Sequence, residues 1–117
     1  MSPLKNIIAL SFFLGSGSMA LSDDLAACAR RAADNPVQSN MCYQKALAGE
    51  DARLNKAYVE LKRQLPPRKF ASLKEGEHRW LVERDYKCKM DAITIDLACL
   101  LTETSKRADE LESLLRF

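Results

Sequence analysis

The residues with the clearest chemical potential are two acids, Asp51 and Glu77, the single histidine His78, and the cysteines. A pair of carboxylates is what glycoside hydrolysis requires, one as the acid and the other as nucleophile or base. A cysteine activated by a histidine can act as a nucleophile. Cys88, Cys99 and His78 together could also ligate zinc. Three kinds of site therefore have to be weighed: hydrolytic, nucleophilic and metal-binding.

The first twenty residues have the pattern of a secretory signal. Lys5 precedes the apolar run Ile7–Leu14, and a segment of small residues ends at Ala20. The run is much shorter than the ~20 residues that span a bilayer. We expect cleavage after Ala20, which leaves residues 21–117 as one domain exported to the periplasm.

A second cleavage pattern competes with the first. Leu25–Cys28 (LAAC) matches a lipoprotein box, which would make Cys28 a lipidated N-terminus. Asp23 and Asp24 separate this box from the apolar run, where a peptidase acting within the membrane needs uncharged residues. Lipidation would also leave one of the other three cysteines unpaired. The favoured prediction is a soluble periplasmic protein, with anchoring at Cys28 as the alternative.

The charge of the expected mature chain is nearly balanced. Residues 21–117 carry 17 basic and 16 acidic side chains, a formal net charge of +1, and the two signs alternate. Such a pattern does not favour a nucleic-acid partner. The sequence has no Gly-rich phosphate loop or catalytic triad pattern, and it implies no cofactor.

Turn-forming residues are few and divide the chain into helical segments. Asp34–Pro36 and Pro66-Pro67 interrupt a sequence rich in Ala, Leu, Lys, Arg and Glu, which is typical of an all-α protein. Ser22 followed by two acids is a favourable helix start, and Gly49 is a possible weak point in the second helix. The predicted helices cover residues 22–33, 37–65, 67–90 and 94–115. The predicted fold class is a small, disulfide-stapled bundle of about four helices.

Four cysteines in an exported chain predict two disulfides. Cys28 and Cys42 lie symmetrically about the first turn, and Cys88 and Cys99 flank the third connection in the same way. Among the three possible connectivities we favour 28–42 and 88–99, each worth about 3 kcal/mol in the chain-entropy model. The nucleophilic and zinc sites both need reduced cysteines, so both are disfavoured.

Helical spacing places a few polar residues on otherwise apolar faces. They are Asp51 in the second predicted helix, Glu77 and Arg84 in the third, and Thr104 and Arg107 in the fourth. Since unpaired buried charges are costly, we predict an internal salt-bridge network that joins the three long helices. With an arginine available to each acid, both carboxylates should stay ionised, which disfavours a general acid.

The aromatic and flanking residues of these faces suggest structural roles. Trp80 is expected to anchor the core, with Tyr58 and Phe70 as packing partners. His78 lies one position off the stripe and is expected at the surface. Asp85 flanks the same stripe, where it can pair with a neighbouring base.

Three segments of the chain follow a recognisable order of motifs. Residues 51–58 read as D-x-x-L-N-x-x-Y, residues 73–88 as L-K-x-x-E-x-x-W-x-x-x-R-D-x-x-C, and residues 99–111 as C-L-x-x-x-T-x-x-R-x-x-x-L. The pattern resembles the LprI-like family of small exported proteins, named for a lysozyme inhibitor. The matching residues are Asp51, Leu54, Asn55, Tyr58, Leu73, Lys74, Trp80, Arg84, Asp85, Cys88, Cys99, Leu100, Thr104, Arg107 and Leu111.

The chain departs from the family pattern at two places. Glu77 stands where the family usually has Gln, which adds a charge to the expected network. The connection between Cys88 and Cys99 lacks the Gly-rich insert of many relatives, so a function carried by such an insert is not expected here. The motif residues coincide with the polar stripe positions and the cysteines. They therefore describe architecture more than an inhibitory surface.

The resemblance implies an α-helical, disulfide-bonded protein of the bacterial envelope that inhibits a lysozyme or a related peptidoglycan hydrolase. The expected mechanism is insertion of a basic or amide-bearing edge between the carboxylates of the hydrolase cleft. The alternative is an envelope adaptor or immunity-type protein with a different protein partner. Candidate contact residues, chosen by charge and expected exposure, are Arg68, Lys69, Lys87 and Lys89.

Overall fold

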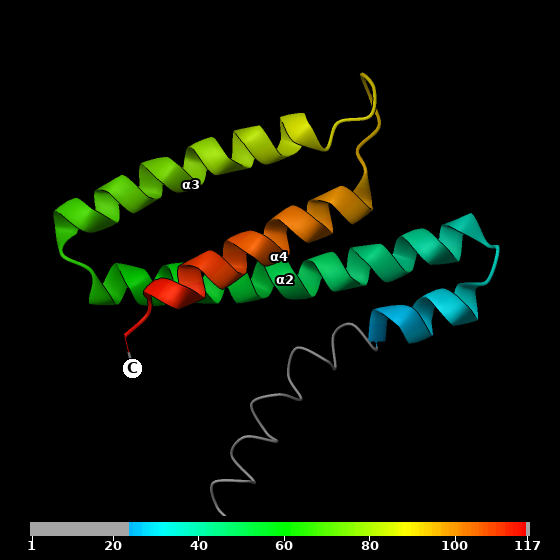
Figure 1. Cartoon of the computed structure of the whole chain (residues 1–117), viewed down its shortest axis with the longest axis horizontal. Coiled ribbons are helices and arrows are strands. Elements are labelled where there is room, and N and C mark those ends of the chain that lie inside the picture. Colours follow the sequence, from blue (N-terminus) through cyan, green and yellow to red (C-terminus); the bar gives the residue numbers. More distant parts are fainter. Residues whose placement is uncertain (1–23, 117) are drawn as a thin grey trace, which may run out of the picture. The chain divides into compact units, whose positions relative to one another are not determined.

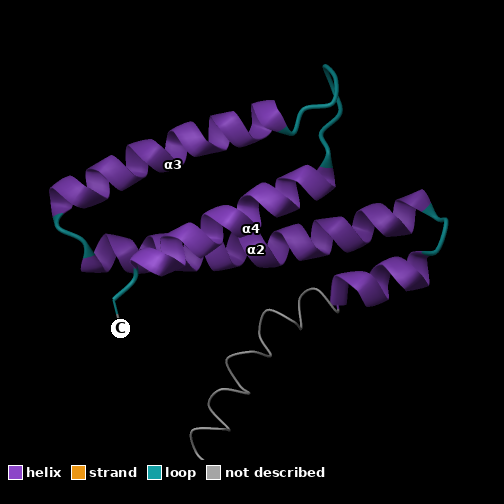
Figure 2. Ribbon diagram, viewed as in Figure 1, coloured by secondary structure: helices purple, strands orange, loops and turns teal. Residues whose placement is uncertain are grey.

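The computed structural model describes residues 24–116. A helix over residues 24–32 precedes α2 (Pro36–Gln64), α3 (Pro67–Lys87) and α4 (Leu97–Leu114), as Figures 1 and 2 show. Within this range the only β-type pairing is an isolated antiparallel bridge, Lys89–Ile95. The all-α, disulfide-stapled fold is therefore confirmed.

The expected signal peptide, residues 1–20, and the helix start at Ser22 lie outside the described residues. Among the helices that the structure does describe, none combines the length and the apolar character needed to cross a membrane.

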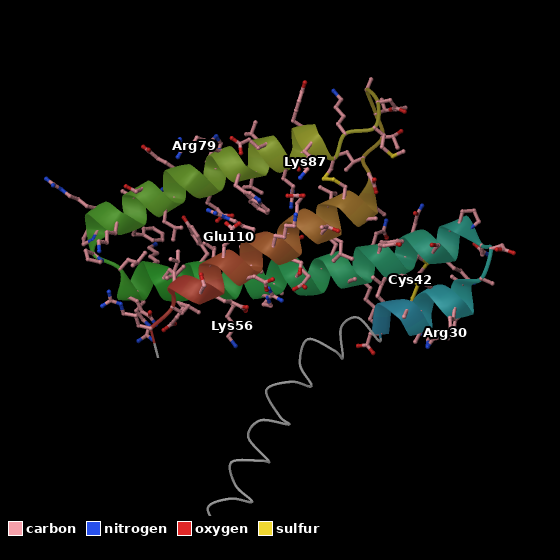
Figure 3. All side chains as sticks on the ribbon, viewed as in Figure 1. Arg30, Cys42, Lys56, Arg79, Lys87 and Glu110 are labelled. Atoms are coloured by element: carbon pink, nitrogen blue, oxygen red, sulfur yellow. A yellow bond between two sulfur atoms is a disulfide. The ribbon has the colours of Figure 1, made fainter. Side chains whose placement is uncertain are left out.

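The chain divides into two compact units, and the boundary falls within α2, between Cys42 and Tyr43. In the first unit, the disulfide Cys28–Cys42 joins the helix over residues 24–32 to the first turns of α2, and its sulfur atoms flank the label of Cys42 in Figure 3. Asn35 begins α2 by accepting the backbone N–H of Gln38 on its side-chain oxygen, at 3.1 Å. Pro36 follows in the first turn, where its missing N–H has no cost. The first predicted disulfide is confirmed.

The second unit has a small core made by α2 and α4. Leu54, Ala57 and Leu61 of α2 meet Ala108 and Leu111 of α4, and all five are buried. The two alanines leave room for the helices to approach closely. α3 contains no fully buried residue and packs on this core through half-buried side chains such as those of Leu73 and Trp80. Polar contacts must therefore contribute much of what holds α3 in place.

The aromatic residues are arranged differently from the simplest expectation. Tyr58 and Phe70 pack on each other, with ring centroids 5.2 Å apart and planes inclined by 55°. Trp80 is half-buried and is flanked by arginine side chains. The tyrosine–phenylalanine pair joins α2 to the start of α3, and Trp80 belongs to the contact of α3 with α4.

The third connection is longer than predicted. The sequence placed helix ends at residues 90 and 94, whereas α3 ends at Lys87 and α4 begins at Leu97. Asp91 and Asp96 account for the difference. The Asp91 carboxylate accepts two backbone N–H groups of a turn, and the Asp96 carboxylate accepts the backbone N–H of Cys99 and so caps α4. Both interactions compete with helix continuation.

The predicted weak point at Gly49 does not interrupt α2, which runs unbroken through it. A Cβ added at Gly49 would meet no atom within 4 Å. Replacement by alanine should therefore raise the free energy of unfolding by about 0.5–1 kcal/mol, because glycine loses more backbone entropy on folding. Chemical denaturation of Gly49→Ala measures this gain. The reverse change at the exposed neighbour, Ala48→Gly, should lower stability by a similar amount, and no change in either variant would contradict the account.

Candidate functional site

The contact between α3 and α4 is built around Trp80. The guanidinium carbons of Arg84 and Arg107 lie 5.2 and 5.9 Å from the Trp80 ring centroid. Arg107 Nε donates to Glu77 Oε2 at 3.2 Å, and Arg84 donates to the hydroxyl oxygen of the buried Thr104 at 3.1 Å. Stacking on an aromatic face suits the weakly hydrated guanidinium group. The cluster joins the two helices through charge and packing together.

Asp51, which the sequence placed in the same network, lies at its edge. Its side chain is 54% exposed, and its carboxylate is 3.9 Å from Arg84. The nearer carboxylate partner of Arg84 is Asp85, at 2.9 Å. Asp51 therefore contributes little to the attachment of α3.

The structure contains a second charged cluster, between α2 and α4, which the sequence analysis did not predict. The Glu50 side chain is 3% exposed, pairs with Arg53 at 3.2 Å, and accepts the Ser105 hydroxyl at 3.0 Å. Arg53 also pairs with Asp109 and Glu112 of α4. A signal was present in the spacing, because Ala46, Glu50, Leu54, Ala57 and Leu61 recur at steps of four and three. The sequence analysis followed the neighbouring stripe that contains Asp51 and did not consider Glu50.

An open groove of about 380 Å³ runs between α2 and α3. We call it the motif groove, because its α2 wall consists of the four residues of the first motif segment. Its α3 wall includes Glu77, whose Oε2 is paired with Arg107 and whose Oε1 is buried without a hydrogen-bond partner. The lining residues are Asp51, Leu54, Asn55, Tyr58, Lys74, Glu77, His78 and Leu81.

The motif groove brings together the two acids considered for hydrolysis. Glu77 is held by Arg107 and Asp51 faces Arg84, so each carboxylate has a cationic neighbour. Both acids therefore belong to the charged contacts between the helices, Glu77 closely and Asp51 at the edge.

The cysteines are not available for chemistry. Cys88 is bonded to Cys99, as predicted, so neither sulfur can ligate zinc or act as a nucleophile beside His78. His78 is exposed, as expected, at the edge of the motif groove. Among residues 24–116 no cluster of three potential metal ligands occurs.

The four basic candidates for a partner contact do not form one surface. Arg68 and Lys69 lie in the first turn of α3, whereas Lys87 is its last residue and Lys89 follows it. A helix of this length separates its ends by ~30 Å. Lys87 is already engaged, because its ammonium group lies 2.6 Å from Glu103 and lowers the pKa of that carboxyl group. Figure 3 shows Lys87 at the end of α3.

Residues 88–99 form a closed segment that we call the cystine loop. The disulfide joins its ends, and the bridge Lys89–Ile95 pairs its two arms. At its turn the backbone N–H groups of Ile93 and Thr94 donate to Asp91, each at 2.9 Å, and lower the pKa of that carboxyl group. Figure 1 shows this connection, in yellow and gold, extending beyond the ends of α3 and α4.

Comparison with known proteins gave one result. The family model described as "Lysozyme inhibitor LprI" matches residues 28–111, which is most of the chain. The match includes all four cysteines, the Trp80 cluster, the motif groove and the cystine loop. No curated protein and no solved structure matches the chain.

The Glu50–Arg53 cluster should contribute strongly to stability. Arg53→Met keeps the apolar stem but removes the charge, which leaves the buried Glu50 carboxylate with only the Ser105 hydroxyl. We expect the free energy of unfolding to fall by about 2–3 kcal/mol, measured by urea denaturation at pH 7.

Arg63→Met is the matched control. Arg63 lies on the same helix and pairs with Glu60, but its side chain is 76% exposed. Its loss should change stability little, because solvent already screens the pair. Equal losses in the two variants would show that the burial of Glu50 has no special weight.

Proposed function

The chain belongs to the LprI family, and from that membership we propose that it inhibits a lysozyme-type peptidoglycan hydrolase by binding to it. The observation that carries the proposal is the family match over residues 28–111. In this proposal the protein is not an enzyme. It acts by covering the cleft in which a muramidase binds its substrate. The partner is a protein, and no cofactor is needed.

The side-chain chemistry supports a binding protein. Both acids of the motif groove have arginine neighbours, and Cys88 and Cys99 are consumed in a disulfide. Rigid, cross-linked proteins make good inhibitors, because they lose little conformational freedom on binding. The two disulfides and the charged clusters supply that rigidity.

We further propose that the protein acts in the periplasm after removal of residues 1–20, with residues 21–117 as the mature domain. Two disulfides in a small chain fit an oxidising compartment. The sulfur of Cys28 is bonded to that of Cys42, and a lipid anchor would need the same atom. This supports release by signal peptidase over anchoring at Cys28.

Blocking is the simplest mechanism for inhibiting such an enzyme. Muramidases place two carboxyl groups on either side of the scissile glycosidic bond and need the cleft open to the glycan chain. A protein that covers this cleft prevents substrate from entering without any chemical reaction. The expected complex therefore has one inhibitor per enzyme.

A lysis assay tests the proposal. The exported, oxidised protein is titrated against c-type and bacterial muramidases acting on peptidoglycan, and lysis by at least one enzyme should fall to a plateau at one equivalent. A glycosidase that acts on starch serves as the control and should keep its activity. Absence of inhibition across the panel at micromolar excess, with the helical content intact, would reject the proposal and favour an adaptor with a different protein partner.

A further inference from the structure

We propose that the cystine loop, residues 88–99, together with Tyr86, is the element that enters the glycan cleft of the target hydrolase. This inference rests on the proposed inhibitory function and identifies the surface that would carry it. The cleft itself is the stated occupant of this surface: a concave site with apolar sugar-binding walls and catalytic carboxylates.

The loop has the rigidity that insertion requires. Its ends are closed by the disulfide, and the backbone N–H of Asp96 donates to the carbonyl of Cys88 at 2.9 Å. Across its arms, the N–H of Met90 donates to the carbonyl of Thr94, also at 2.9 Å. The Asp91 carboxylate holds the turn between them. A loop fixed in this way has little conformational entropy left to lose in a complex.

The loop also exposes apolar side chains that such a scaffold would ordinarily bury. Ile93 is 94% exposed at the turn, and Met90 of the same loop is 67% exposed. Tyr86, in the last turn of α3, is 81% exposed. Burying these side chains against a partner is favourable, and tyrosine is a frequent anchor of protein interfaces. Concentrated exposure on a rigid, projecting element marks an interaction surface.

One cation of the loop is available to a cleft that contains carboxylates. Lys87 is neutralised by Glu103, and Asp85 is paired with Arg84. The Asp91 carboxylate accepts backbone N–H groups of the turn and keeps its negative charge two residues from Lys89. Lys89 is exposed and forms no ion pair within residues 24–116. It therefore places a cation beside the apolar tip, complementary to the acid pair of a muramidase.

The motif groove fits the same partner less well. It is concave, so it cannot itself enter another cleft, and it mixes Lys74 with the acids Asp51 and Glu77. The opposite end of α3 carries Arg68 and Lys69 but no comparable group of large apolar side chains. Among the described residues, the cystine loop combines projection, rigidity and large exposed apolar side chains with Lys89, which is exposed and forms no ion pair there.

Two variants test the loop, each with a matched control. Ile93→Asp removes the apolar tip, and Lys89→Glu reverses the cation. We expect each to weaken inhibition of the muramidase identified by the lysis assay at least about thirtyfold, as for central interface anchors. The controls make the same changes elsewhere: Val59→Asp and Lys56→Glu, both at exposed positions of α2. Both controls should inhibit within about twofold of the unaltered protein.

Competition locates the docking site on the enzyme. A soluble oligomer of N-acetylglucosamine fills the muramidase cleft, so it should displace the inhibitor in a binding titration. If the affinity is the same with and without the oligomer, the loop does not enter the cleft and the proposal is overturned.

The outcomes separate the two proposals. If the unaltered protein inhibits and both loop variants inhibit equally well, the loop assignment is wrong while the inhibitory function stands. If the unaltered protein inhibits no muramidase, both fall. Circular dichroism and thiol titration establish that each variant keeps its helices and disulfides. Ile93→Ser replaces Ile93→Asp if the latter does not fold, with the same loss of inhibition expected.

Discussion

The second unit of this protein depends on arginine side chains that reach from one helix to another. Its apolar core is small, and α3 contributes no fully buried residue to it. Arg53 connects α2 to α4, and Arg84 and Arg107, both close to the Trp80 ring, connect α3 to α4. Each guanidinium group offers several donors in one plane, so one side chain can satisfy more than one acceptor while its stem covers apolar surface. The arrangement compensates for limited hydrophobic burial.

This dependence has a consequence for function. Charges used to hold helices together are not free for catalysis, and Glu77 shows the conflict most directly. One of its oxygens is paired with Arg107, while the other is buried without a partner beside the motif groove. A carboxylate in this position maintains the structure and shapes the groove. The residues that resemble an active site in the sequence are thus better explained as a framework.

The disulfides restrict the conformation of the chain at the ends of helices. Cys88–Cys99 closes the connection between α3 and α4 and allows a short, irregular segment to keep a defined shape outside any core. Such a segment can expose apolar side chains without collapsing onto the helices. The helices are stabilised by ion pairs and packing. The projecting loop is stabilised by a disulfide and by the hydrogen bonds of its turn. We assign recognition to the loop.

The sequence alone was sufficient for the helical class, the two disulfides and the family, since all three depend on local features: helix-forming composition, cysteine symmetry about turns, and motif spacing. It was also sufficient to single out Glu77, Arg84, Thr104 and Arg107 as polar residues on helix faces.

The buried charged cluster, the end of α3 and the exposed loop depended on tertiary structure. A one-residue difference in the choice of stripe hid Glu50, because helical periodicity does not determine which edge of a face is buried against another helix. The early end of α3 depended on the turn at Asp91. The exposure of Ile93 depended on the position of the loop that the disulfide Cys88–Cys99 closes. Local pattern determines which residues can share a face, whereas only packing decides which of them are buried, paired or left exposed to a partner.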